Sequence, residues 1–319
     1  MLTRRLTLAV AVLPAAASAQ GTFPDAPVRM IIPFPPGGPA DLIARLLGRS
    51  MGERLGQPVV VESRSGAGGA IGVDAAAKAR PDGQTIVLAS TGALVVLPHM
   101  MARMAYGPLR ELSPICHVLS VPQVLVVRRG GAADVAVLVA QAKAAPGRLT
   151  FGSAGNGSSL HLAGELFKLR TGADITHVPY RGAAPALTDL LGGSISMMLA
   201  DVPVVLPGIR SGDLVALAVT AAARNPALPS VPTMAEAGVT GAESETWYAL
   251  FGPAGVPADR VARLHRAAAE SLAEPELRRG LEEQGGAIVG STPEQLAATL
   301  RSEHAKWGEI VRLSGARLE

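Results

Sequence analysis

The chain has 319 residues, of which 48% are hydrophobic and only 3% aromatic, and its formal net charge of +3 contains no Lys/Arg-rich run. This length is long for a single core, so we expect two domains, and the nearly balanced charge argues against nucleic acid as a partner. Cys116 is the only cysteine, which excludes an intrachain disulfide. Its apolar surroundings predict a buried, structural thiol.

The first twenty residues have the three parts of an export signal. Arg4 and Arg5 form a basic start, an apolar run follows from 6 to 16, and an Ala-Ser-Ala sequence ends at Ala19. The apolar run is shorter than the roughly 20 residues that a membrane-spanning helix needs. We therefore expect cleavage after Ala19 and a soluble mature protein in the periplasm that begins at Gln20. The signal does not decide between the Sec and twin-arginine routes.

Short apolar runs then alternate with amphipathic stretches, which predicts an α/β protein with mainly parallel sheets. The predicted strands lie at residues 28–32, 59–62, 85–89, 123–127, 149–152, 175–178, 195–199, 214–220 and 246–251. The predicted helices lie at 39–55, 135–145, 159–171 and 185–191, with further helices from 257 onward. The last helix is well marked, with Thr292 as its N-cap, Pro293 in first position, Gln295 completing a capping box and Gly315 after its end.

Loops rich in glycine or hydroxyl groups follow five of the predicted strands, at residues 33–38, 90–93, 152–159, 179–183 and 200–203. In the first of them, Gly37 and Gly38 precede a helix start, where backbone N–H groups and the positive end of the helix dipole favour a carboxylate or phosphate. Ligands of open α/β sheets bind outside the carboxyl ends of the strands, so these loops predict one common cleft. For the first loop taken alone, a strand-to-helix turn that binds nothing is an equal alternative, whereas a plain turn and N-cap accounts for only one serine of the 152–159 loop.

The sequence lacks the spacing of the common catalytic motifs. The glycines from 66 to 72 miss the dinucleotide-binding pattern, and neither a P-loop nor a G-x-S-x-G serine is present. The six histidines have no close metal-ligand spacing, and His161 reads more simply as a packing side chain than as a base. We therefore expect no enzyme, no cofactor and no metal. A hydrolase or isomerase of a small exported acid is the alternative, and a base within hydrogen-bond reach of a nucleophile would mark it.

An ordered series of motifs runs from Phe23 to the C-terminus. It includes FPPGG at 34–38 followed by Asp41 and Arg45, GAGG at 66–69, GSAGNG at 152–157, HVPYRG at 177–182 and VPTMAEAG at 231–238. Together these motifs resemble the Bug-type solute receptors, the periplasmic component of tripartite tricarboxylate transporters. The resemblance implies a two-domain, Venus-flytrap-like periplasmic-binding-protein fold with two crossing strands, near Val121 and Thr246. Domain one would comprise residues 20–121 and 247–319, and domain two residues 122–246.

The same resemblance implies a function. The protein would be a monomeric receptor that closes around a small carboxylate, either a di- or tricarboxylate, an amino acid or an aromatic acid, and presents it to a membrane permease. A receptor that reports ligand occupancy to a signalling protein is the alternative, because the same fold and cleft would serve both roles.

Carried over position by position, the resemblance assigns ligand contacts to both sides of the cleft. They are Phe34, Gly37, Gly38, Asp41, Ser90 and Thr91 on one side, and Ser153, Asn156, Gly157, Ser158, His161, Tyr180, Arg181 and Asp201 on the other. Two positions depart from the family pattern: Ala40 replaces the usual Ser or Thr, which removes a hydroxyl contact, and Ser63 replaces the usual Asn. Arg181, where Lys is more usual, is equally well explained as a solvated charge.

Asp201 has two expected roles. Near the ligand, its carboxylate would repel a second ligand carboxylate and favour an amino or hydroxyl group. Alternatively it would cap the helix expected to start near Val202. Trp247, next to the second crossing, is expected to pack in the core.

Overall fold

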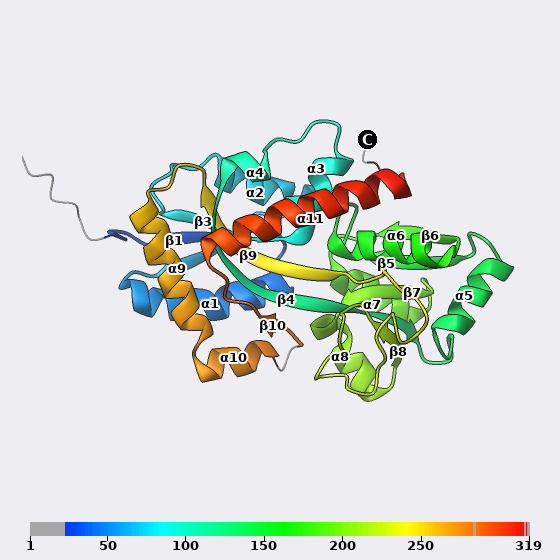
Figure 1. The fold of residues 1–319 in the computed structure, drawn as a ribbon. Helices are drawn as coiled ribbons and strands as arrows, with labels where there is room; N and C mark the ends of the chain where they lie inside the picture. Colours follow the sequence, from blue (N-terminus) through cyan, green and yellow to red (C-terminus); the bar gives the residue numbers. More distant parts are fainter. Residues whose placement is uncertain (1–22, 283–284, 316, 318–319) are drawn as a thin grey trace, which may run out of the picture.

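The computed structural model describes residues 23–282, 285–315 and 317, so the predicted export signal at 1–19 lies outside the described residues. Ten strands form one curled sheet in the order β2-β1-β3-β9-β4-β7-β5-β6, with β8 and β10 also paired to β4. Figure 1 shows that the helices cover both faces and that the molecule has two lobes joined by β4 and β9. Within the described residues, no helix has the length and apolar character to cross a membrane.

The first lobe is built from both ends of the chain. Its elements are β1 (Val28–Ile32), α1 (Pro39–Leu55), β2 (Val59–Ser63), a 3₁₀ turn (Ala67–Gly69), α2 (Ala70–Ala77), β3 (Thr85–Ser90), a π-helical turn (Gly92–Val96), α3 (Leu97–Met100), α4 (Pro108–Glu111), α9 (Ala258–Leu272), α10 (Pro275–Glu282), β10 (Ala287–Ile288) and α11 (Pro293–Ser314). Strand β1 pairs in parallel with β2 and β3. One face of this sheet packs on α1 and α9, and the other on α2 and α11.

The second lobe is built from the middle of the chain. Its elements are α5 (Val135–Ala144), β5 (Leu149–Ser153), α6 (Ser159–Thr171), β6 (Ile175–Pro179), α7 (Ala183–Gly192), β7 (Met197–Asp201), α8 (Val202–Ser211) and β8 (Leu214–Val219). Strand β5 pairs in parallel with β6 and β7. Helices α5 and α6 cover one core, and α7 and α8 cover the core on the opposite face.

The two crossing strands are β4 (Leu112–Arg128) and β9 (Glu245–Pro253), which run antiparallel to each other. Residues 112–122 of β4 pair with β9, and residues 123–128 pair with β7 and β8. One strand therefore takes part in the sheets of both lobes. The α/β fold with two crossing strands is as predicted, whereas the residue boundaries 20–121, 122–246 and 247–319 stay a prediction.

Two features of the sheet differ from the sequence-based prediction. The sheet is mixed rather than mainly parallel, because β4 and β9 run antiparallel to the neighbours that they connect. The strand predicted at 123–127 is only the second half of β4. Pro114 and Pro122 hid the first half, since proline cannot donate to a strand ladder. The pairing with β9 shifts register just after Pro114, and this bulge accommodates it.

Other predictions are confirmed closely. Helices α1 and α6 span the predicted residues, and α11 has the predicted capping box, with Thr292 accepting from the Gln295 backbone and Gln295 accepting from that of Thr292. Cys116 and Trp247 are fully buried in the cores of the first lobe. Burial raises the pKa of the Cys116 thiol to about 12, which makes it unreactive.

Candidate functional site

A cavity of about 720 Å³ lies between the two lobes, against the crossing strand β9. Its lining comes from the loop and helix start at 34–40, Ser90, Ala154, the helix start at 158–160, residues 181–185, 187 and 188, the start of α8 and two residues of β9. The cavity thus forms where several strands end and helices begin, as the loop pattern predicted. Its size is typical of sites for small organic ligands.

Four helices, α1, α6, α7 and α8, begin at the cavity wall. Gly38, Ser158, Gly182 and Asp201 are their N-cap residues, and all four residues line the cavity. The first backbone N–H groups of a helix have no partner within the helix, and the dipole places positive charge at this end. At α8 the Asp201 carboxyl occupies this place and Pro203 has no N–H, so the ends of α1, α6 and α7 are the three that favour an anionic ligand.

The loop before α1 is held in place by Asp41. The carboxylate of Asp41 accepts the Gly37 N–H at 3.1 Å and pairs with the Arg45 guanidinium at 2.9 Å. The hydrogen bond from Arg45 holds the pKa of Asp41 below its usual range. Gly37 has a φ of +85°, a backbone conformation that favours glycine. Asp41 therefore shapes the cavity wall without lining the cavity itself.

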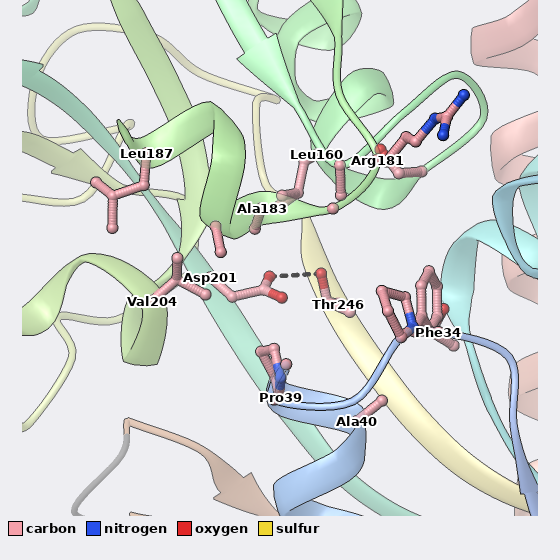
Figure 2. A pocket seen from close by; sticks show the side chains of 18 of the residues that line it. Phe34, Pro39, Ala40, Leu160, Arg181, Ala183, Leu187, Asp201, Val204 and Thr246 are labelled. Carbon is pink, nitrogen blue, oxygen red and sulfur yellow. Dashed lines mark hydrogen bonds between the residues drawn. The ribbon is translucent and has the colours of Figure 1, made fainter. Parts of the chain in front are cut away.

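The opposite wall carries a buried acid, Asp201, which bonds to the crossing strand (Figure 2). Its Oδ1 accepts from the Thr246 hydroxyl at 2.6 Å. Burial raises the pKa of Asp201 to about 7, while hydrogen bonds from Thr246 and Tyr248 act in the opposite direction. Asp201 occupies the N-cap position of α8 but makes no side-chain capping hydrogen bond. Asp201 is thus the N-cap residue of α8, as the alternative expected, but its side chain bonds to the crossing strand and not to the helix.

The remainder of the cavity wall is mostly apolar. Figure 2 shows Leu187 and Val204 beside Asp201, with Pro39 and Ala40 opposite. Arg181, the one cationic side chain of this lining, is exposed and extends away from Asp201. The cavity thus offers helix ends to an anion and apolar surface to the body of a ligand.

Half of the residues predicted as ligand contacts line this cavity. They are Phe34, Gly37, Gly38, Ser90, Ser158, Arg181 and Asp201. The others lie near it but outside its lining: Asp41, Thr91, Ser153, Asn156, Gly157, His161 and Tyr180. For most of this second group the structure shows another role.

These roles are mainly internal hydrogen bonds. The Thr91 hydroxyl accepts the Trp247 N–H at 2.8 Å, and the Tyr180 hydroxyl donates to Asp189 at 2.6 Å. His161 stacks on His177 with ring centroids 3.9 Å apart, and its Nδ1 accepts the Gly157 N–H at 3.3 Å. His161 is thus a packing histidine, the simpler of the two readings.

One serine and histidine pair has the geometry expected for a hydrolase or isomerase, a base within hydrogen-bond reach of a nucleophile. Ser153 Oγ lies 2.7 Å from His177 Nε2. Ser153 is fully buried, and neither residue lines the cavity. Burial lowers the pKa of His177 to about 3, which makes it a weak base. The pair joins β5 to β6 outside the cavity.

Sequence reasoning missed several lining residues. Thr246 and Tyr248 belong to β9, which was considered only as a crossing strand and as core. Alternation along this strand was an available signal, because it places 246 and 248 on the face opposite Trp247. Leu187 and Val204 are ordinary apolar residues of α7 and α8, and no local pattern distinguishes them from core residues.

The lobes touch each other beside the cavity. A Cβ added at Gly92, the first residue of the π-helical turn, would lie 2.8 Å from the Gly157 carbonyl oxygen and 3.2 Å from the Ser158 Cα. The backbones of the two lobes are therefore in direct contact, and any side chain here would force them to shift. Across the described parts of the chain, no group of three or more metal-ligating side chains comes together.

Comparison with known proteins places the chain among solute receptors. Residues 43–315 match the tripartite tricarboxylate transporter family receptor model. The chain is 42% identical over 300 residues to protein BugT of Bordetella pertussis, covering 93% of this chain and 92% of BugT.

Solved structures agree. The chain is 34% identical to Rpa4515 of R. palustris, solved with adipate, with a TM-score of 0.87 over 92% of this chain and 98% of that one. It is 33% identical to the periplasmic binding protein BugD, with a TM-score of 0.87 over 93% of this chain and 100% of that one. The fold is thus the two-domain fold of periplasmic binding proteins, and the chain belongs to the receptor family of tripartite tricarboxylate transporters.

Proposed function

We propose that this protein binds one small carboxylate in the cavity between its lobes and presents it to the membrane permease of a tripartite tricarboxylate transporter. The observation that carries this proposal is the convergence of three helix N-termini without an acidic cap, those of α1, α6 and α7, on one cavity of about 720 Å³. Such a site binds an anion without a cationic side chain. Backbone donors also suit a carboxylate, which accepts several hydrogen bonds at once.

The comparisons support an acid as the ligand. Rpa4515, which shares 34% of its residues with this chain and nearly the same fold, was solved with adipate. Of the predicted contacts, we propose that Gly37, Gly38 and Ser158 lie next to the ligand carboxylate, because they stand at two of the helix starts. Phe34 would cover the ligand from the first lobe.

The remaining steps of the proposal follow from the two-lobe architecture. Ligand binding would close the lobes about β4 and β9, and the closed form would be the one that the permease recognises. We propose that the receptor acts as a monomer in the periplasm after cleavage at Ala19, and that its domains divide at the boundaries predicted from the sequence.

A thermal-shift panel tests this function. The protein is stripped of any retained ligand by unfolding and refolding, then heated with mono-, di- and tricarboxylates, amino acids and aromatic acids. We expect one class to stabilise it. A ligand at about 100 times its Kd adds roughly 2.7 kcal/mol, which raises the Tm by several degrees. Stabilisation by no acid at all would overturn the proposal.

Proton NMR of the incubated acid provides the control for catalysis. A receptor leaves the acid unchanged for hours, whereas conversion of the acid into a product would favour the hydrolase or isomerase.

A further inference from the structure

The polar groups of the deeper cavity wall converge on one acid, Asp201. Thr246 and Tyr248 both project from β9 toward its carboxyl, and the Thr246 hydroxyl donates to Oδ1 at 2.6 Å. Both donors are buried and fixed by a strand that pairs on both sides. The orientation of the Asp201 carboxyl is therefore set before any ligand arrives.

Hydrogen atoms in this network point toward Asp201. Gln123 Nε2 donates to Thr246 Oγ1 at 3.1 Å, while Gln123 Oε1 accepts from Ser244 at 2.7 Å. The single hydroxyl hydrogen of Thr246 goes to Asp201, so Ser159 Oγ, 2.7 Å from Thr246 Oγ1, must act as a donor to it. The one hydroxyl hydrogen of Ser159 is therefore already used in this bond. Asp201 and Ser159 can therefore only accept hydrogen bonds from a ligand.

Among the described residues that line the cavity around Asp201, the other side chains offer these acceptors no donor. Leu187 and Val204 flank it with apolar surface, and Pro39 across the cavity has no backbone N–H. Arg181 extends toward solvent. A buried acceptor left without a donor is costly, so a ligand that supplies a donor here gains affinity.

We infer that Asp201 selects among carboxylic acids by the group they carry at the end away from the bound carboxylate. A hydroxyl or amino group at that end donates directly to Asp201. A second carboxylate binds there only with one proton taken up from solvent, which lies between the ligand oxygen and the Asp201 oxygen. A methyl group leaves the acceptor unpaired. This inference rests on the proposed function and specifies its ligand class.

The surroundings of Asp201 permit such proton uptake. Tyr248 is the titratable side chain that faces it, from β9. The residues presented by β4, α6 and α7 are Gln123, Ser159, Ala183 and Leu187, which carry no charge. Burial raises the pKa of Asp201 to about 7, so a bound proton near neutral pH is within reach.

Two matched series of acids test the inference. The first is hexanoate, 6-hydroxyhexanoate and adipate, and the second is benzoate, 4-hydroxybenzoate and terephthalate. Binding is measured by calorimetry at pH 8 in two buffers of different ionisation enthalpy, which counts the protons taken up. In at least one series, we expect the hydroxy acid to bind about tenfold or more tighter than its unsubstituted partner. The diacid should bind with uptake of about one proton.

Variants separate the role of Asp201 from general electrostatics. Asp201→Asn replaces the acceptor by an amide that can itself donate, so we expect the hydroxyl preference to disappear and the diacid to bind without proton uptake. Asp174→Asn, which makes the same change at an exposed site outside the cavity, should retain both properties.

The unaltered protein alone can overturn the inference, so the test does not depend on how the variant folds. Equal affinity for the hydroxy and unsubstituted acids, or a diacid that binds without proton uptake, would contradict the role of Asp201 while leaving the receptor function intact. Failure of every acid in these series and in the thermal-shift panel would instead remove the proposed function together with the inference.

Discussion

A single residue, Gly92, is expected to limit the closure of the lobes that we propose. A Cβ at this position would lie 2.8 Å from the Gly157 carbonyl oxygen, and backbone atoms cannot move aside as a side chain tip can. The conflict exists only while the lobes touch. Because overpacking costs about 1–3 kcal/mol, we expect Gly92→Ala to weaken ligand binding by roughly 10- to 100-fold. Calorimetry with the acid that binds tightest would measure this loss.

In the open form that we propose, the lobes would separate at this contact, so the stability of the unliganded Gly92→Ala variant should change less than its affinity. Gly280→Ala is the matched control. It lies inside α10 with nothing within 4 Å of the added Cβ, so we expect a gain in stability of about 0.5–1 kcal/mol and unchanged affinity. Equal affinity of Gly92→Ala and the unaltered protein would contradict this role of Gly92.

At the residue scale, sequence patterns identified side chains better than they identified roles. Ser158 and Asp201 were both expected near the ligand, and both line the cavity. Asp41 and Thr91 were placed there too, yet their polar atoms hold the loop before α1 and the strand β9. A motif indicates that a residue is needed for the structure or function of its own segment. Whether it faces the ligand or supports the wall depends on contacts between distant segments, which a motif does not contain.

At the element scale, the start of α11 offers a clean test of local structure. Thr292 forms a capping box with Gln295, and Thr292→Ala removes one of its two hydrogen bonds. We expect a loss of about 1 kcal/mol in the free energy of unfolding, measured by urea denaturation. Ligand affinity should stay the same, since Thr292 lies outside the cavity lining.

Ser302→Ala is the control on the same helix, because Ser302 is exposed and bonds only to the Thr299 carbonyl. Its effect should stay within about 0.5 kcal/mol. If both variants lose equal stability, the capping box does not contribute as described.

Helices such as α1 and α6 could be predicted to the residue because their signals are local. Each has a glycine or serine N-cap, and each ends at a glycine in the left-handed conformation. The bounds of strand β4 could not be predicted in this way, because they depend on its pairing with strands in both lobes. Pairing with β9 and then with β7 and β8 outweighs the two prolines that interrupt its apolar pattern.

At the scale of the whole molecule, buried histidines make stability depend on pH. Burial lowers the pKa of His117 and His161 to about 4 and that of His177 to about 3. The unfolded chain, with histidine pKa values near 6.5, therefore binds more protons between about pH 6.5 and 4. Stability must fall as the pH falls through this window. Asp201, whose pKa is raised to about 7, and Glu245, whose pKa is also raised by burial, act in the opposite direction but are two groups against three.

We expect the free energy of unfolding of the ligand-free protein to drop by about 3 kcal/mol or more between pH 7 and pH 4. Urea denaturation at several pH values measures this, and His177→Gln should flatten the slope. Constant or rising stability on acidification would show that these histidines are not buried as neutral groups.

The overall architecture was predictable because the order of the motifs along the chain is typical of one receptor family. Two α/β lobes and two crossings follow from the resemblance and agree with the sheet order. The shape of the cavity was not predictable in the same way. Val204, Leu187 and Tyr248 meet there only because α7, α8 and β9 converge, and each looks like a core residue in its own segment.

A crystal structure of the chain grown with the tightest-binding acid tests the central claim most directly. We predict that the acid lies between Phe34 and Asp201, with its carboxylate at the starts of α1, α6 or α7 and its other end toward Asp201. An acid bound outside the cavity, or one whose only carboxylate faces Asp201, would contradict this account of the site.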